Sequence, residues 1–314
     1  MNKPLVSVCI ITYNQEPYIR QAIESVLMQK VNFPWEIIIA DDCSKDKTRE
    51  IILEYKDRYP DLIKPLFQKR NVGGGKNFTD LINTAAGKYV AYLEGDDYWT
   101  DGKKLQKQFD FMESHPDFAL CYHKIKWHNT KPYDHILDMA SNENDKPVST
   151  IDDLFDRGWY IRSCSMFFKN IPLPDEFEHL YVGDYPLHIL LADKGKLGFI
   201  DEVMGIYRIH ANGLSETKLH TVDVGKRKNI FRNEILLYKY LNNRTEFRYN
   251  RQFKTKLFDS FYMHLVFLMK DSRKNLVNEI LASIKLLGPS VIFSGFISKF
   301  LTKLKGKQLT YTTA

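Results

Sequence analysis

The sequence predicts an α/β fold, in which a mostly parallel sheet is flanked by helices and followed by a helical, basic C-terminal extension. Short β-branched runs alternate with segments of helical periodicity over the first hundred residues. Strands that alternate with helices imply right-handed crossovers and parallel pairing. Each of these runs also ends in polar or acidic residues, at the strand ends where such sheets bind their ligands. Beyond residue 220 the pattern is helical and rich in lysine and arginine.

The predicted elements follow one another in regular order. Leu5–Ile11 has the composition of a strand buried on both faces, and Glu16–Gln29 then carries an apolar stripe at helical spacing. The next strands and helices are expected at Trp35–Ala40, Lys45–Tyr59, Ile63–Phe67, Asn77–Ala86 and Lys88–Leu93. Later elements are expected as short strands near Phe118–His123 and Ser165–Phe168, a polar loop over Asn129–Pro147, and helices near Val224–Tyr240, Arg251–Lys270 and Lys274–Leu287.

Charge divides the chain into two parts. Residues 221–314 hold 18 Lys+Arg and 6 Asp+Glu, a net +12, so the first 220 residues carry −6 of the total of +6. We therefore expect a body over residues 1–220, with halves 1–100 and 101–220, and a basic region over 221–314. A basic region commonly meets an anionic surface, although a solvated helical face would have the same composition.

Several classes of protein are disfavoured by what the sequence lacks. The four cysteines form no CxxC pair or zinc pattern, which fits a reducing cytosol. There is no apolar leader and no window of about 18 apolar residues, so we expect a cytoplasmic protein. The stretch Arg70–Lys76 lacks P-loop spacing, and no GxGxxG follows the first strand. These absences argue against an ATPase and against a nicotinamide dehydrogenase.

Paired carboxylates at two strand ends are the first candidates for chemistry. Asp96 and Asp97 follow a buried run, and adjacent carboxylates repel unless a cation lies beside them. Oxygen ligands suit Mg²⁺ or Mn²⁺, which bridge carboxylates to substrate phosphates. Asp41 and Asp42 end the neighbouring strand, where a carboxylate can accept from a base or a ribose. The alternative in both places is a turn or helix cap.

Two later stretches add further candidates. Asp184 precedes an apolar helical stripe and could equally be a helix cap. Arg208 and His210 lie two apart on an extended segment, so both point the same way, as a clamp on a diphosphate requires. A surface cationic pair is the alternative.

Together these stretches resemble the family 2 inverting glycosyltransferases, which have the A-type glycosyltransferase fold with a nucleotide-binding sheet. The matching stretches, in the family's order, are VSVCIITYNQEPYIRQAIESVLMQ, DDCSKDKT, NVGGGKNF, YVAYLEGDDYW, GDYPLHILLA and YRIHANGLS. They span about residues 4–217.

The resemblance implies a role for each matching position. Thr12, Tyr13, Asn14 and Asp42 would hold the nucleoside, with Asp42 facing the base. Arg70 and Asn71 would lie along the donor, although the loop glycines differ from the commoner family pattern. Asp96 would touch the ribose or the metal, Asp97 would be the principal ligand of the cation, and Arg208 and His210 would close over the diphosphate, with His210 also counted among the metal ligands. Asp184 would be the general base.

These roles imply a single displacement that inverts the anomeric centre, with Asp184 taking the proton of the acceptor hydroxyl. The sequence departs from the family's processive polymerases, since no QxxRW motif follows, and this favours addition of one sugar per encounter. The alternatives are a sugar-phosphate nucleotidyltransferase, which would need a GxGTRxxP-like stretch where TYNQEPY stands, and a non-catalytic nucleotide-sugar-binding protein.

The expected partners are a nucleotide-sugar donor and a glycan or lipid-linked glycan acceptor, in surface polysaccharide biosynthesis, and no nucleic acid. Val291–Leu304 carries an apolar stripe, with Lys299, Lys303, Lys305 and Lys307 at its edges and beyond. Residues 291–307 would suit attachment to the anionic inner face of the membrane. Packing on the body or on a second subunit of a homodimer is the alternative.

Overall fold

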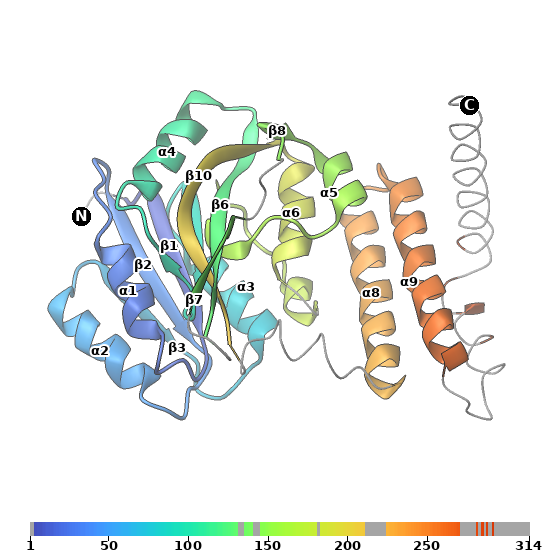
Figure 1. The fold of residues 1–314 in the computed structure, drawn as a ribbon, viewed down its shortest axis with the longest axis horizontal. Helices are drawn as coiled ribbons and strands as arrows, with labels where there is room; N and C mark the ends of the chain where they lie inside the picture. Colours follow the sequence, from blue (N-terminus) through green and yellow to red (C-terminus); the bar gives the residue numbers. More distant parts are fainter. Residues whose placement is uncertain are drawn as a thin grey trace. The chain divides into compact units, whose positions relative to one another are not determined.

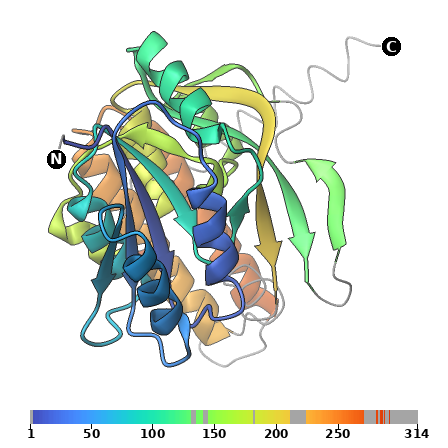
Figure 2. The same ribbon diagram turned by 90° about the vertical axis from the view of Figure 1, so that its left-hand side faces the viewer.

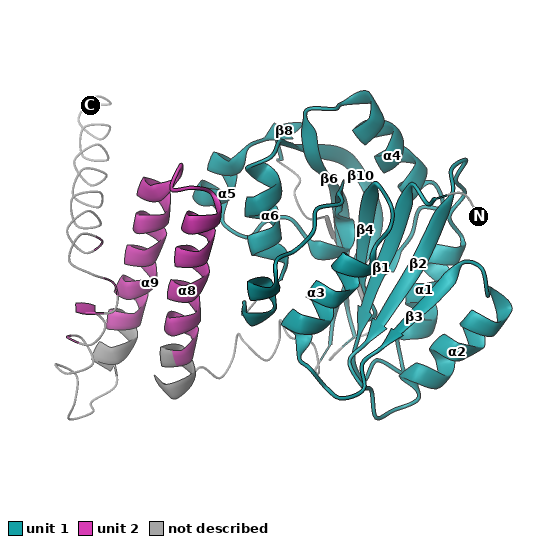
Figure 3. Cartoon of the chain, turned by 180° about the vertical axis from the view of Figure 1, so that it is seen from behind, with its two compact units in different colours: residues 1–217 teal, residues 218–314 magenta. Residues whose placement is uncertain are grey.

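The computed structural model describes residues 3–130, 135–140, 145–180, 183–210 and 224–270, together with residues 281, 284, 285, 287 and 291. The chain divides into two compact units, Met1–Thr217 and Lys218–Ala314 (Figure 3). The expected division after residue 220 falls within residues that the structure does not describe.

Unit 1 is built on one sheet, to which the described residues contribute ten strands (Figure 1). The strands follow the order β3-β2-β1-β4-β9-β6-β10-β5, with β7 paired to β6 and β8 paired to β10. Their bounds are β1 (Val6–Thr12), β2 (Trp35–Asp41), β3 (Ile63–Phe67), β4 (Tyr89–Glu94), β5 (Tyr98–Trp99), β6 (Phe118–Asn129), β7 (His135–Ala140), β8 (Val148–Ser149), β9 (Phe167–Lys169) and β10 (Lys196–Ile209).

Strand direction brings the candidate residues to one edge of the sheet. Strands β3, β2, β1 and β4 are parallel neighbours. Strand β9 is antiparallel to both β4 and β6, and β6 is parallel to β10, so β6 and β10 run in the same direction as β4. The carboxyl ends of β1, β2, β4 and β10 therefore lie along the same edge, where ligands of α/β sheets bind.

Helices cover both faces of this sheet. The helices of unit 1 are α1 (Ile19–Leu27), α2 (Thr48–Arg58), α3 (Gly74–Thr84), α4 (Lys104–Ser114), α5 (Ile151–Arg157) and α6 (Asp184–Ala192), with short 3-10 turns η1 (Ser163–Ser165) and η2 (Asp175–His179). Helices α1 and α2 lie on one face and α3 on the other (Figure 2). This is the arrangement that right-handed crossovers dictate when the chain moves outward to β3 and then returns to β4.

The alternation of side chains along the strands decides which face each residue packs on. Val6, Val8 and Ile10 of β1 belong to one buried cluster with residues of α1 and α4. On the opposite face, the ring of Tyr92 in β4 contacts that of Phe78 in α3 at 5.3 Å between centroids. Because both faces are covered, the central strands are apolar almost throughout, as parallel strands are.

Unit 2 contains two long helices, α8 (Val224–Arg244) and α9 (Asn250–Lys270), which pack along each other. Their cluster includes Phe231, Phe258 and Leu287, and Val291 is also buried in it. Within the described residues, no helix is both long enough and apolar enough to cross a membrane.

The predicted fold class is confirmed, and the central strands lie within a residue or two of their expected positions. The polar loop expected over Asn129–Pro147 is wrong in part, because β7 lies within it and pairs with β6 in antiparallel register. Of the expected helix Lys274–Leu287 the structure describes only single residues. Of residues 291–307 it describes Val291 alone.

Candidate functional site

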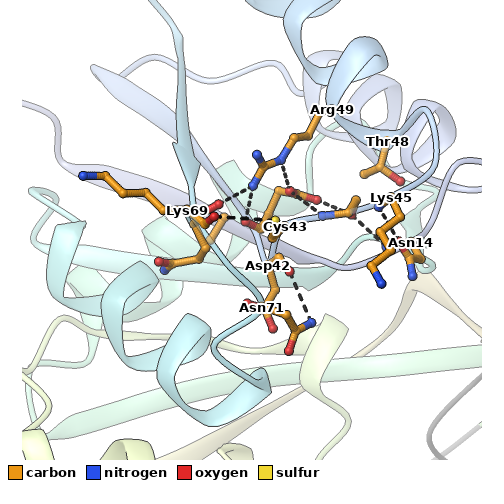
Figure 4. Close-up of polar contacts among 12 residues, drawn as sticks. Asn14, Asp42, Cys43, Lys45, Thr48, Arg49, Lys69 and Asn71 are labelled. Atoms are coloured by element: carbon orange, nitrogen blue, oxygen red, sulfur yellow. Dashed lines mark hydrogen bonds and ion pairs between the residues drawn. The ribbon is translucent and has the colours of Figure 1, made fainter.

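The loops after β1 and β2 are tied together by side-chain to backbone hydrogen bonds (Figure 4). The Asn14 N–H donates to Ser44 Oγ, and the Lys45 N–H donates to Asn14 Oδ1, each at 2.8 Å. Asn14 and Cys43 both have positive φ angles, 52° and 63°, which turn each strand end sharply into its loop. Asn tolerates this conformation because its side chain bonds locally, so Asn14 shapes the loop in which it lies.

Asp42 organises the loop that follows β3. Its two carboxylate oxygens accept from the backbone N–H groups of Val72 and Gly73 at 2.6 and 2.9 Å. Asn71 Nδ2 donates to the Asp42 carbonyl at 3.3 Å (Figure 4). Gly73 has a φ of 87°, a conformation that favours glycine. The carboxylate expected to face the nucleoside base thus also holds the glycine-rich loop in place.

The neighbouring Asp41 is buried in an ion pair. Its carboxylate contacts the guanidinium of Arg49 in α2 and accepts from the Ser44 N–H at 3.0 Å. Arg49 in turn donates to the Gln68 carbonyl at 2.5 Å and lies over the Phe67 ring. Asp41 therefore anchors α2 and β3 to the end of β2, while Asp42 is turned toward the glycine-rich loop.

Gly95 allows the loop after β4 to approach β1 closely. A Cβ atom at this position would lie 2.3 Å from Gln15 Oε1 and 3.0 Å from Thr12 Oγ1. Thr12 Oγ1 and Gln15 Oε1 are both buried and have no hydrogen-bond partner. Glycine thus leaves room for this close contact, which brings Asp96 and Asp97 beside the end of β1.

Asp96 and Asp97 are adjacent but have different surroundings. The Asp97 side chain is buried, and its Oδ1 accepts from the Arg208 N–H at 2.8 Å. Burial raises the pKa of Asp97 well above its usual range, and the nearby charges of Asp96 and Glu94 act in the same direction. The Asp96 side chain is partly exposed, and its Oδ2 lies 2.9 Å from His210 Nε2.

Arg208 and His210 extend from the end of β10 to the same place. The Arg208 guanidinium donates to the Asp96 carbonyl and to Gln21 Oε1. It lies between the rings of Tyr18 and Tyr98, at 5.0 and 4.6 Å from their centroids. Burial lowers its pKa from the ordinary value, and the charges of Asp97 and Asp96 oppose that shift. The alternation of β10 accounts for the shared direction of Arg208 and His210.

The polar atoms left over at this place suit a divalent cation in part. Asp97 Oδ2 and His210 Nδ1 are buried without hydrogen-bond partners, and the carboxylate of Asp96, the residue before Asp97, contacts His210 Nε2 at 2.9 Å. Among the described residues there is no group of three or more His, Cys, Asp or Glu side chains that could hold a metal ion. Carboxylate oxygens are the ligands that Mg²⁺ and Mn²⁺ favour, and substrate phosphates and water commonly complete their coordination.

Asp184 begins helix α6, and it is held by a tryptophan. Trp159 Nε1 donates to Asp184 Oδ2 at 2.8 Å. Gly183 precedes Asp184 as the N-cap, and its close contact with the Phe78 ring leaves little space for a side chain.

The buried Glu94 carboxyl accepts from Ser163 Oγ at 2.7 Å. Burial, together with the charges of Asp96 and Asp184, raises the pKa of Glu94 to about 8.

The structure brings most of the predicted residues together in two linked groups. Asn14, Asp42 and Asn71 form the first, and Asp96, Asp97, Arg208 and His210 form the second. The loop before α1 joins the groups, because the Glu16 N–H donates to Asp46 in the loop after β2 while Tyr18 contacts Arg208. Thr12 is buried at the junction, whereas Tyr13 and Arg70 are exposed.

Sequence reasoning missed five residues of this site. Glu94 belongs to the acidic strand end and could have been found there. Tyr18, Gln21, Ser163 and Trp159 come from a helix, its preceding loop, a 3-10 turn and the loop after α5, and no spacing in the sequence marks them. Their proximity depends on tertiary contacts between distant segments.

Comparison with known sequences matches this chain to a family. Residues 7–170, just over half of the chain, match the model of glycosyl transferase family 2. An uncharacterized protein of Mycobacterium tuberculosis, Rv1520, is 37% identical over 215 residues, which are 67% of this chain and 60% of that protein. The chain thus spans about 60% of the length of this relative.

A shorter relative has a more specific name. TuaG of Bacillus subtilis, whose name refers to teichuronic acid biosynthesis, is 41% identical over 110 residues, which are 35% of this chain and 42% of TuaG. This name describes the role of TuaG and not that of the present chain.

Comparison with solved structures shows the same fold. S. aureus TarS, residues 1–349 in complex with UDP-GlcNAc, has a TM-score of 0.62 at 18% identity, over 91% of this chain and 82% of that one. The mannosyltransferase PcManGT of Pyrobaculum calidifontis, in complex with GDP-Man and Mn²⁺, has a TM-score of 0.53 at 13% identity, over 98% of this chain and 88% of that one. The family model covers more than half of the chain, and the chain belongs to glycosyl transferase family 2.

Proposed function

We propose that this chain transfers a single sugar from a nucleoside-diphosphate sugar to an acceptor hydroxyl, with inversion at the anomeric carbon and assisted by a divalent cation. One observation carries the proposal. Asp96 and Asp97 from β4 meet Arg208 and His210 from β10 at the carboxyl edge of the sheet, in hydrogen-bonded contact. Family membership and the fold support the same reaction class.

The donor would lie along the carboxyl ends of β1, β2 and β4. Asp42 and Asn71, which are hydrogen-bonded to each other, would receive the nucleoside, beside the loop that Asn14 fixes. Arg70, which is exposed, would lie along the donor. The guanidinium of Arg208 carries five N–H donors, and it is well suited to charge that develops on phosphate oxygens. Tyr18 and Tyr98 hold it in position.

Asp96 and His210 would contact the cation directly, and Asp97 would support them from the interior. Asp97 gives one oxygen to the backbone of β10, whereas Asp96 is partly exposed and touches the imidazole. This assignment differs from the expectation that Asp97 is the principal ligand of the cation. The buried Oδ2 of Asp97 has no hydrogen-bond partner and remains available as a further ligand. When bound, Mg²⁺ or Mn²⁺ would stabilise the negative charge of the departing diphosphate. PcManGT is an example of a structural neighbour seen with Mn²⁺.

Asp184 would act as the general base. It begins a helix, where its charge is favoured, and it lies close enough to Glu94 for their charges to interact. A carboxylate in this position can take the proton of an acceptor hydroxyl as the hydroxyl attacks the anomeric carbon from the face opposite the diphosphate. A direct attack of this kind needs no covalent intermediate and inverts the configuration.

A surface polysaccharide intermediate is the acceptor class that the named relatives favour, as the name of TuaG indicates. Such acceptors are often held on lipid, which would suit a basic C-terminal region at the inner face of a membrane. Unit 2 is built of long helices with exposed basic positions, among them Lys239 and Arg251.

The test is a transfer assay with a panel of nucleoside-diphosphate sugars, with and without Mn²⁺, followed by NMR of the product's anomeric proton. The proposal predicts cation-dependent release of a nucleoside diphosphate and a product with the configuration opposite to that of the donor. Retention of configuration would contradict the single displacement. Turnover that is unchanged in the presence of a chelator would contradict the role of the cation.

A further inference from the structure

Trp159 occupies an unusual position beside the proposed general base. Helix α5 begins with a capping box between Thr150 and Asp153 and ends at Gly158, whose φ is 71°. A residue in this left-handed conformation ends the helix and redirects the chain. The next side chain, Trp159, then reaches Asp184 at the start of α6, while Tyr160 is buried. The placement of the indole is therefore built into the local backbone.

The indole is anchored at one end and open to solvent along much of its surface. Its N–H donates to Asp184 Oδ2 at 2.8 Å, and its ring centroid lies 6.1 Å from that of Tyr185, which is buried. Yet 42% of Trp159 is exposed. Single exposed apolar residues are common and need no explanation. This one is hydrogen-bonded to the carboxylate that would receive the acceptor's proton, so whatever carries the acceptor hydroxyl must come next to the indole.

The charge around Trp159 indicates what kind of acceptor fits. Between residues 145 and 159 there are four aspartates, Asp145, Asp152, Asp153 and Asp156, and two basic residues. Both bases are paired with acids, Lys146 with Asp153 at 2.7 Å and Arg157 with Asp145. The stretch that leads to Trp159 therefore carries a net negative charge, which disfavours an anionic group such as a phosphate but not a neutral ring with one apolar face.

We propose that Trp159 forms the acceptor subsite, where its indole face receives a neutral pyranose ring and its N–H positions Asp184. The inference rests on the proposed transfer reaction and names the part of the acceptor that this site recognises. A flat aromatic surface offers a large contact area to the C–H face of a sugar with little loss of side-chain entropy. The donated N–H holds the carboxylate in one orientation and favours its ionised form.

Two substitutions separate these two contributions. Trp159→Phe keeps an aromatic face and removes the N–H donor. We expect kcat to fall by about 10-fold or more, as hydrogen bonds to charged groups allow. The acidic limb of the kcat–pH profile should move to higher pH, because loss of a donor raises the pKa of the base. The KM for the acceptor should change little.

Trp159→Ala removes the face as well, so the KM for the acceptor should also rise, by about 10-fold. Trp35→Phe is the matched control. Trp35 begins β2 and pairs with Val6 at the amino ends of these two strands, away from the carboxyl ends that carry the site. Its substitution should therefore leave the KM and the pH profile unchanged. Thermal unfolding of each variant shows whether it is folded.

The assay uses methyl glycopyranosides as acceptors, with glycerol 3-phosphate as the anionic, acyclic comparison. Transfer to a pyranoside, with the two variants affected as described, supports the subsite. Preference for glycerol 3-phosphate, or wild-type KM and pH profile in Trp159→Ala, overturns it while leaving the transfer reaction in place. Donor hydrolysis is followed in parallel, and its absence together with that of all transfer would instead contradict the proposed function.

Discussion

The four aspartates at this site form two adjacent pairs in the sequence, but the carboxylate of each has different surroundings. Asp41 is held by a partly exposed arginine, Asp42 by backbone N–H groups, Asp97 by the backbone of β10, and Asp96 by an imidazole. One oxygen of Asp97 is taken by a backbone N–H in the interior, whereas Asp96 keeps contact with solvent and can meet a cation. On this basis Asp96 is the better candidate for contact with a cation.

Asp184→Asn tests the general base directly. The change keeps the size of the side chain and an oxygen that can accept the Trp159 N–H, but it removes the basic group. Removal of a general base commonly lowers the rate by about 10²–10⁴-fold. We therefore expect transfer to fall by about this factor while calorimetry shows unchanged donor binding.

Turnover within a few-fold of wild type across pH would place the base elsewhere. Asp175, Glu176 and Glu178 of η2 would then be the next candidates.

The identity of many site residues could be predicted at the residue scale, but their partners could not. The acidic strand ends and the Arg208–His210 spacing pointed to this edge of the sheet from the sequence alone. The resemblance made Asp97 the principal ligand, but the sequence did not show that Asp97 is buried against a backbone N–H of β10, far along the chain. Trp159 was missed for the same reason.

At the scale of elements, buried polar contacts tie helices to the sheet. The Asp41–Arg49 pair links β2 to α2, and the carboxylate end of the pair is fully buried. Breaking a buried pair by removing one partner leaves an uncompensated charge, which costs about 3–5 kcal/mol. Arg49→Met should therefore lower the free energy of unfolding by about 3 kcal/mol in urea titrations.

Arg20→Met is the matched control. Arg20 forms an ion pair with Glu54 at 2.7 Å, but both side chains are almost half exposed. Exposed pairs contribute about 0–1 kcal/mol. Equal losses of unfolding free energy in the two variants would show that the Asp41–Arg49 pair contributes no more than an exposed pair.

Lys104 in α4 should make the free energy of unfolding depend on pH. Its Nζ is buried, 2.6 Å from Gln108 Oε1 and over the ring of Trp99. Burial lowers the pKa of Lys104 from 10.5 to about 7. Between these pH values the unfolded chain binds the proton and the folded chain does not, so this residue makes stability rise as pH rises from about 7 toward 10.5.

Lys104→Met should flatten that rise, since methionine has a similar volume and no titratable group. Each unit of pKa shift corresponds to about 1.4 kcal/mol at most. Urea titrations at several pH values measure the slope. A slope unchanged by the substitution would contradict the lowered pKa.

Periodicity located the central strands and helices well, because strands buried on both faces must be apolar runs and amphipathic helices must show a stripe. Strand β7 was missed, because its stretch is bordered by polar and turn-forming residues and pairs only with one neighbour. Of the long β10, only the extended segment that carries Arg208 and His210 was expected, and the register of this strand with β6 shifts at several points.

At the scale of the whole molecule, the acidic first 220 residues and the basic remainder suggest two tasks for one chain. Val291 is buried in the core of unit 2, so the amphipathic stretch that begins there is continuous with a packed element. Residues 292–307 lie outside the described residues. Each lysine near an anionic surface could contribute about 1 kcal/mol to binding.

Liposome co-sedimentation tests whether this stretch binds membranes. The full chain should bind vesicles that contain anionic lipid, less so as salt is added, and should not bind neutral vesicles. A chain that ends after Val291 should stay folded and lose this binding. Binding that survives the truncation, or a full chain that ignores anionic vesicles at low salt, would assign the stretch another role.

The central claim is that this chain binds a nucleoside diphosphate together with a divalent cation at the Asp96–His210 edge of the sheet. Thermal unfolding with UDP, GDP, CDP and dTDP, each with and without Mn²⁺, tests it most directly, since a ligand that binds only the folded state must stabilise it. At about 100 times the Kd the stabilisation is about 2.7 kcal/mol. We expect at least one diphosphate to raise the Tm only when Mn²⁺ is present, with the rise lost in Asp96→Asn and kept in Asp184→Asn. No rise with any diphosphate, or an equal rise in Asp96→Asn, would contradict the account.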